Sequence, residues 1–123
     1  MKFEREQAAG RNTFTGYGEG YVAVNGARHS SSLVVSSERL VTDWQASSID
    51  ALTPRHLAAI VELKPEIVLL GTGSKFAFPE PALLAPLYKA GIGVEIMDTQ
   101  AACRTYNILL GEGRNVVAAV IVP

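Results

Sequence analysis

Three short and mainly apolar runs stand out in the second half of the chain. They are Glu66–Leu70, Val94–Met97 and Val116–Val122. A continuous apolar run, in contrast to an alternating one, is typical of a strand that is covered on both faces of its sheet. We therefore predict three buried strands. We place Val116–Val122 inside the sheet, because an exposed strand of this composition would promote aggregation.

The segments around these strands have helical periodicity and residues that favour helix boundaries. The predicted helices run from Thr53-Pro54 to Pro65, from Ala82 or Leu83 to Ala90, and from Asp98 or Thr99 to Gly111. The expected apolar faces are Leu57, Ile60 and Val61 in the first helix, Leu83, Leu84, Leu87 and Tyr88 in the second, and Ala102, Tyr106, Leu109 and Leu110 in the third.

A β-hairpin is predicted near the start of the chain. Asn25-Gly26 favours a tight turn, because both residues of a type I′ turn need a positive φ. Tyr21–Val24 precedes this turn, and Arg28–Ser36 is the expected return strand, with Leu33–Val35 as its apolar part. The glycines of Thr13–Gly20 indicate turns, a bulge or close backbone approach. The hairpin either extends the main sheet or forms a second small sheet.

The order of elements predicts an α/β fold. After the hairpin and a short strand within Glu38–Thr42, helices and strands alternate. Right-handed crossovers then make the later strands parallel, with helices packed on the sheet. A length of 123 residues suits one domain. We predict a single domain over residues 1–123, in which residues 1–12 form either a loose N-terminal arm or a first edge segment.

Composition and charge narrow the functional classes. The net charge is −1, and the 11 basic residues are scattered along the sequence. We therefore do not expect nucleic-acid binding, which depends on clustered positive charge. The first ten residues include Glu4 and Glu6 and lack an apolar run, so they resemble neither a secretory signal nor a transit peptide. No apolar run is long enough to span a bilayer. We expect a cytoplasmic protein.

The candidate binding site is a crevice between two segments that follow predicted parallel strands. Gly71, Thr72, Gly73 and Ser74 follow the first, and Asp98, Thr99, Cys103 and Arg104 follow the second. Ligands bind at the carboxyl ends of strands in open α/β sheets, and helix N-termini favour anions. The alternative is structural: glycines that form a tight turn, and Asp98 or Thr99 as a helix cap. The Asp98 carboxylate would also repel an anion unless the cap occupies it.

Cys103 and Arg104 lie near the start of the third predicted helix. That position lowers the pKa of a thiol, although a small buried cysteine is the simpler interpretation. Arg104 lies off the apolar face and can reach solvent or a ligand. One cysteine and two histidines make no zinc signature, so we predict no metal and no cofactor. His29 and His56 are expected at the surface.

Four aromatic residues lie in connections, outside the periodic elements: Tyr17, Trp44, Phe76 and Phe78. Aromatic residues in loops are either interface anchors or caps that fold back onto the core. The sequence leaves both interpretations open.

The stretches PEIVLLGTGSKFAFPEP and GIGVEIMDTQAACRTYNILLGEGRNV resemble a family of small proteins of unknown function. That family includes the mitochondrial complex I assembly factor 3 and a human adipogenesis-associated protein. The likeness covers most of the chain from about Phe14 onward, including Tyr17-Gly18 and Val24-Asn25-Gly26. It implies a three-layer α/β domain with a central mixed sheet. Because the first residues do not resemble a mitochondrial leader, we expect a bacterial-type member of the family. No enzymatic activity is implied.

From these observations we predict a non-catalytic protein-interaction or assembly module. Its expected partners are other proteins, including subunits of membrane complexes. The alternative is a protein that binds a small anion or polar metabolite, or an enzyme, that uses the crevice between Gly71–Ser74 and Asp98–Arg104.

Overall fold

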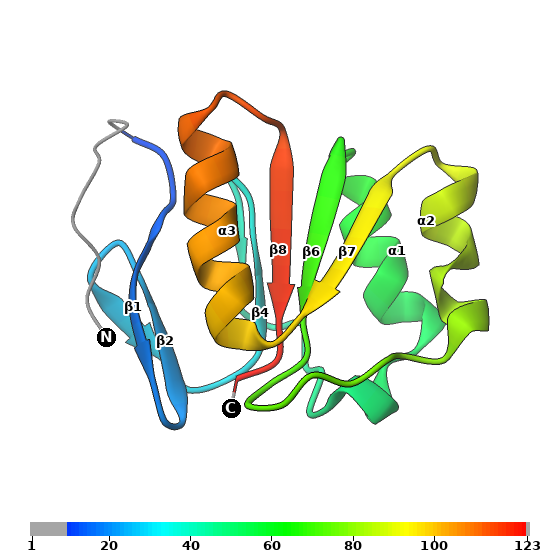
Figure 1. Ribbon diagram of the computed structural model, residues 1–123, viewed down its shortest axis with the longest axis horizontal. Coiled ribbons are helices and arrows are strands. Elements are labelled where there is room, and N and C mark those ends of the chain that lie inside the picture. The colour runs from blue at the N-terminus through cyan, green and yellow to red at the C-terminus, as the bar shows by residue number, and fades with distance from the viewer. Residues whose placement is uncertain (1–9, 123) are drawn as a thin grey trace.

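The computed structural model describes residues 10–122, which form two β-sheets and the helices packed against them (Figure 1). The strands are β1 (Phe14–Gly18), β2 (Tyr21–Val24), β3 (Ala27–His29), β4 (Leu33–Val35), β5 (Leu40–Val41), β6 (Ile67–Gly71), β7 (Gly93–Met97) and β8 (Val116–Val120). The helices are α1 (Pro54–Glu62), α2 (Ala85–Lys89) and α3 (Thr99–Gly111), with 3-10 turns η1 (Ile49–Ala51) and η2 (Pro81–Leu84).

The central sheet is mixed and has the strand order β5-β4-β8-β6-β7. β6 is parallel to both β7 and β8, as the sequence predicts. β4 is antiparallel to β5 and to β8, so the sheet is less uniformly parallel than expected. β8 lies in the middle of the sheet, which confirms the interior position predicted for Val116–Val122.

Both faces of the central sheet are buried, which gives a three-layer architecture (Figure 1). Successive side chains of a strand point to opposite faces. Along β8, Val117 and Ala119 pack in the core beneath α1 and α2, whereas Val116, Ala118 and Val120 pack beneath α3 and the small sheet. This two-sided burial is the physical reason for the uninterrupted apolar run.

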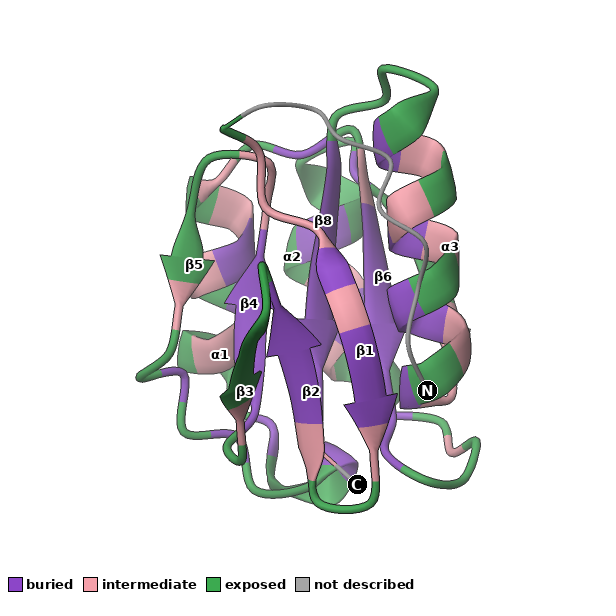
Figure 2. Ribbon diagram, turned by 90° about the vertical axis from the view of Figure 1, so that its left-hand side faces the viewer, coloured by how far each residue is buried: buried purple, intermediate pink, exposed green. Residues whose placement is uncertain are grey.

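The N-terminal hairpin belongs to a separate sheet with the order β1-β2-β3, beside α3 (Figure 2). Asn25 and Gly26 have φ values of 51° and 87°, as the predicted turn requires. The register of β1 shifts between Phe14 and Gly16, which is the predicted bulge or irregularity. The expected return strand Arg28–Ser36 is wrong as one strand. Its first part is β3, and its apolar part is β4 of the central sheet.

The helices differ from prediction in two places. The second helix begins as the 3-10 turn η2 and continues as α2, and Tyr88 on its expected apolar face is 59% exposed. In α3 the buried face includes Cys103, whereas Leu109 is only half-buried. These differences shift the faces by about one residue and leave the helix positions unchanged.

Most of the predicted N-terminal arm, residues 1–9, lies outside the described residues. Asn12, at the end of this arm, is hydrogen-bonded to the fold. Its backbone N–H donates to the carbonyl of Ser37 at 2.9 Å, and its own carbonyl accepts from the Tyr106 hydroxyl at 2.9 Å.

Candidate functional site

The structure brings the two segments of the candidate crevice into direct contact at the carboxyl ends of β6 and β7. The Thr72 N–H donates to the Met97 carbonyl at 2.9 Å, and the Thr99 N–H donates to the Gly73 carbonyl at 2.9 Å. Gly71 allows this close approach, since a Cβ there would lie 3.1 Å from the Thr99 Cα and 3.0 Å from its Oγ1.

Thr99 joins three segments at this junction. Its side chain is fully buried. The hydroxyl donates to the Ile121 carbonyl at 2.6 Å and accepts from the Gly73 N–H at 2.9 Å. The hydroxyl therefore links the ends of β6 and β8 to the start of α3. This role is structural, and a buried polar group with both partners present is stable where an unpaired one would not be.

The remaining candidate residues also have partners within the fold. Asp98 is the N-cap of α3, and its carboxylate accepts from the Ala101 N–H at 2.9 Å. The Thr72 hydroxyl donates to the Lys75 carbonyl at 2.6 Å. Ser74 is exposed at the start of the following loop. Ligand binding at this junction stays a prediction.

Cys103 and Arg104 have opposite environments although they are neighbours. Cys103 is completely buried, and this burial raises the pKa of its thiol to about 12, against the lowering influence of the Arg104 charge. A thiol of this kind is a poor nucleophile near neutral pH. Arg104 is exposed, and its guanidinium donates to the Tyr17 hydroxyl at 2.7 Å.

Of the four aromatic residues expected in connections, two are core residues and two are exposed, and Tyr17 lies within β1. Tyr17 and Trp44 are 4% and 5% exposed. Phe76 and Phe78 are 52% and 72% exposed, and their rings make an edge-on contact with centroids 4.8 Å apart. Only Phe76 and Phe78 fit the interpretation as interface anchors.

The exposure of Phe76 and Phe78 follows from the geometry of the loop between β6 and η2. Exposure alternates along it: Phe76 and Phe78 face solvent, whereas Ala77 packs against the core and Pro79 is buried. Alternation of this kind is typical of an extended segment with one anchored side. We call residues 75–80 the aromatic loop.

The two histidines that were expected at the surface are only partly exposed. His29 is half-buried, and its buried Nε2 has no hydrogen-bond partner among residues 10–122. His56 is half-buried on α1. Its ring makes an edge-on contact with the Trp44 ring, with the two ring centroids 5.5 Å apart. The local sequence pattern predicts that both residues are exposed. Their partial burial arises only from tertiary packing, which the local pattern does not show.

Residues 10–122 show neither a metal-ligand cluster nor a membrane-spanning helix. That part of the chain holds no cluster of three or more histidine, cysteine, aspartate or glutamate side chains suited to a metal ion. None of its helices has the length and apolar content needed to cross a membrane.

Comparisons with known proteins identify relatives of this chain. A Bordetella parapertussis protein of known crystal structure is 42% identical, with a TM-score of 0.86 over 94% of this chain and 98% of that one. The "13 kDa major membrane protein" of Francisella tularensis subsp. holarctica (strain LVS) is 32% identical over 98% of this chain and 99% of its own length.

A mitochondrial relative is similar over a shorter region. The "NADH dehydrogenase [ubiquinone] 1 alpha subcomplex assembly factor 3" of Mus musculus is 39% identical over 85 residues, which are 68% of this chain and 46% of that protein. The chain thus spans about half the length of this relative. The family described as "Protein of unknown function (DUF498/DUF598)" matches residues 14–121. The chain therefore belongs to the DUF498/DUF598 family of proteins of unknown function.

Proposed function

We propose that this protein is a protein-interaction module that acts as an assembly factor, and that the aromatic loop is its contact surface. The observation that carries the proposal is the exposed and mutually contacting pair of Phe76 and Phe78. Aromatic side chains dominate the binding energy of many protein interfaces, because they bury a large area with few rotatable bonds.

The aromatic loop is anchored on both sides of the pair. The Thr72 hydroxyl bonds to the Lys75 carbonyl before the pair, and buried Pro79 follows it. Proline also fixes φ and removes conformational freedom. An anchored loop loses less entropy on binding than a free one, so preorganisation favours an interface role.

The similarity to the mitochondrial relative supports the kind of partner. That relative is an assembly factor for an NADH dehydrogenase subcomplex. By this similarity, the proposed partners are subunits of a membrane-bound complex that are still being assembled. Such subunits expose apolar surface before they are joined, and an exposed aromatic pair matches that surface chemically.

Affinity capture with matched variants tests the proposal. The wild-type chain and the double variant Phe76→Ser/Phe78→Ser are each used as bait in lysate from the encoding organism. Ile108→Ser on α3 is the control, because Ile108 is 61% exposed but lies outside the aromatic loop. We expect wild type and the control to recover the same membrane-complex subunits, and the double variant to lose them.

The proposal is contradicted if the double variant recovers those subunits as well as wild type does. Because both phenylalanines are exposed, the double variant should fold with a stability close to that of wild type. Its melting temperature is measured first, so that a loss of partners is not confused with a loss of folding.

A further inference from the structure

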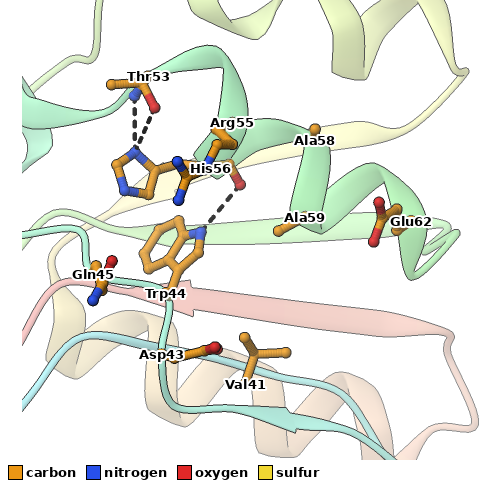
Figure 3. Close-up of a pocket in the computed structure, with 10 residues that line it drawn as sticks. All are labelled: Val41, Asp43, Trp44, Gln45, Thr53, Arg55, His56, Ala58, Ala59 and Glu62. Atoms are coloured by element: carbon orange, nitrogen blue, oxygen red, sulfur yellow. Dashed lines mark hydrogen bonds between the residues drawn. The ribbon is translucent and has the colours of Figure 1, made fainter.

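A pocket of about 480 Å³ lies between α1 and the segment that follows β5, at the β5 edge of the central sheet (Figure 3). This is a different part of the molecule from the aromatic loop, which follows β6. The volume falls within the range of small-molecule pockets, roughly 300–1,000 Å³. The pocket is lined by Val41, Asp43, Trp44, Gln45, Thr53, Arg55, His56, Ala58, Ala59 and Glu62.

One end of the pocket presents hydrogen-bond donors. The Nδ1 of His56 accepts from the Thr53 N–H at 2.9 Å, so the proton of the neutral ring is on Nε2. The Nε2 points away from Thr53 (Figure 3). Arg55, the preceding residue of α1, adds a guanidinium. This end of the pocket suits a carboxylate, which accepts from both kinds of donor.

The other end of the pocket is acidic. Glu62 is seven residues after Arg55 on α1, which places it about 10 Å further along the helix axis. Asp43 adds a carboxylate on the opposite wall, beside Trp44 and Val41 (Figure 3). Among residues 10–122, none of Arg55, Asp43 and Glu62 makes an ion pair, so these charges are not used to hold the fold.

The middle of the pocket is apolar. Trp44 forms its base and is held in place, because its indole N–H donates to the His56 carbonyl at 3.0 Å. Ala59 faces it from α1, and its small side chain leaves the space open (Figure 3). The wall between the two polar ends therefore suits a short aliphatic chain.

Gln45 supplies an independent sign of a binding site. It has a φ of 61°, a left-handed conformation that L-residues other than asparagine and aspartate seldom adopt. Among residues 10–122, two other non-glycine residues share it: Asn25 in the hairpin turn, and Lys64 just after the end of α1. Gln45 follows neither a tight turn nor a helix, and strained residues of this kind cluster at ligand sites.

We propose that this pocket binds a small zwitterion, with a carboxylate at the Arg55–His56 end, an ammonium group at the Glu62 end and an aliphatic spacer over Trp44. Both charges of the ligand meet an opposite charge, whereas a simple anion or cation would meet a like charge at one end. This site is independent of the interaction surface proposed above.

Fluorescence titration reports on this pocket directly, because Trp44 is the single tryptophan of the chain. The probe is 6-aminohexanoate, and the controls are hexanoate and hexylamine, which each lack one charged end. We expect saturable binding of 6-aminohexanoate with a Kd of about 1 mM or tighter, and at least tenfold weaker binding of each control compound.

Charge-neutral variants separate the two ends of the pocket. Arg55→Gln and Glu62→Gln should each weaken 6-aminohexanoate at least fivefold. Lys89→Gln on α2 and Glu95→Gln on β7 remove one exposed charge of each sign elsewhere, and should leave the Kd unchanged. Gln45→Gly should weaken binding without lowering the melting temperature, since glycine adopts the left-handed conformation freely.

Three results would overturn the proposal. One is the absence of saturable binding up to about 10 mM probe. Another is equal binding of 6-aminohexanoate, hexanoate and hexylamine. The last is a Kd that is unchanged in both Arg55→Gln and Glu62→Gln.

Discussion

At the scale of single residues, the junction at the carboxyl end of the central sheet depends on one hydroxyl group. Thr99 is buried between the Gly73 N–H and the Ile121 carbonyl and bonds to both. Helix capping by Asp98 is predictable from local sequence, because the cap acts on a neighbouring residue. The bond from Thr99 to Ile121 spans 22 residues, and no local pattern encodes it.

Replacement of Thr99 by valine tests this hydroxyl. Thr99→Val keeps the shape but leaves a buried N–H and a buried carbonyl without their partner, which costs about 1–3 kcal/mol for each group. We expect a loss of about 2–6 kcal/mol in the free energy of unfolding, measured by urea denaturation. Thr99→Ser keeps the hydroxyl and should lose clearly less. Equal losses in both variants would show that the methyl group, not the hydroxyl, matters.

Because of Cys103, we expect the free energy of unfolding to fall as the pH becomes alkaline. Burial raises the pKa of its thiol from 9.0 to about 12, so the folded state holds this proton more tightly than the unfolded state. The stabilisation is complete below about pH 9 and is lost as the pH rises toward 12, by about 1.4 kcal/mol at pH 10. Burial also raises the pKa of Tyr106, which adds to the loss above about pH 10.

Urea denaturation between pH 8 and 11 measures this dependence. Cys103→Ala should flatten the fall in stability between pH 9 and 10, whatever its effect at pH 8. A thiol reagent at pH 8 should label Cys103 only after unfolding. Rapid labelling of the native protein would contradict the burial of the thiol and would support a role of Cys103 as a nucleophile.

At the scale of elements, the apolar pattern predicts the strands and helices well and their pairing less well. β6, β7, β8 and α3 lie where the sequence places them, because two-sided burial and helix caps leave direct traces in local composition. The predicted return strand does not include the crossing of the chain from β3 in the small sheet to β4 in the central sheet. The signal for this crossing is the polar interruption Ser30–Ser32, which breaks the expected return strand in two.

Side-chain hydrogen bonds from α3 hold the small sheet in place, and local sequence does not predict them. The Asn107 amide clamps the backbone of Phe14: its oxygen accepts from the Phe14 N–H at 3.0 Å, and its nitrogen donates to the Phe14 carbonyl at 2.7 Å. The Phe14 ring also packs edge-on against the Tyr106 ring, with the two ring centroids 5.3 Å apart. The Asn107 side chain thus forms the same pair of hydrogen bonds with β1 that the backbone of a neighbouring strand would form.

Asn107→Ala tests this clamp. Both backbone groups of Phe14 lose their partner, but these bonds are only partly buried and water replaces part of them, so we expect a loss of about 1–3 kcal/mol in the free energy of unfolding. Hydrogen exchange should show faster exchange of the Phe14 amide, because the attachment of β1 to α3 weakens. Ile108→Ala is the matched control on the next, exposed position of α3 and should change neither quantity. Unchanged Phe14 exchange in Asn107→Ala would rule out the clamp.

At the scale of the whole molecule, the two proposed surfaces were the least predictable features. Local sequence does not distinguish buried Trp44 from exposed Phe76 and Phe78, since all three lie in connections. The pocket forms only when α1 docks beside residues 41–45, so His56 looked like a surface residue. The proximity of Gly71–Ser74 to Asp98–Arg104, in contrast, follows from the parallel order of β6 and β7.

The most direct test of the central proposal is photo-crosslinking from the aromatic loop. The photoreactive residue p-benzoylphenylalanine replaces Phe78 in one variant and Ile108 in a matched variant, both of which are exposed. After irradiation in the encoding organism, mass spectrometry identifies the crosslinked proteins. The account predicts that subunits of a membrane-bound complex crosslink from position 78 and not from position 108. Equal crosslinking from both positions, or none from position 78, would contradict it.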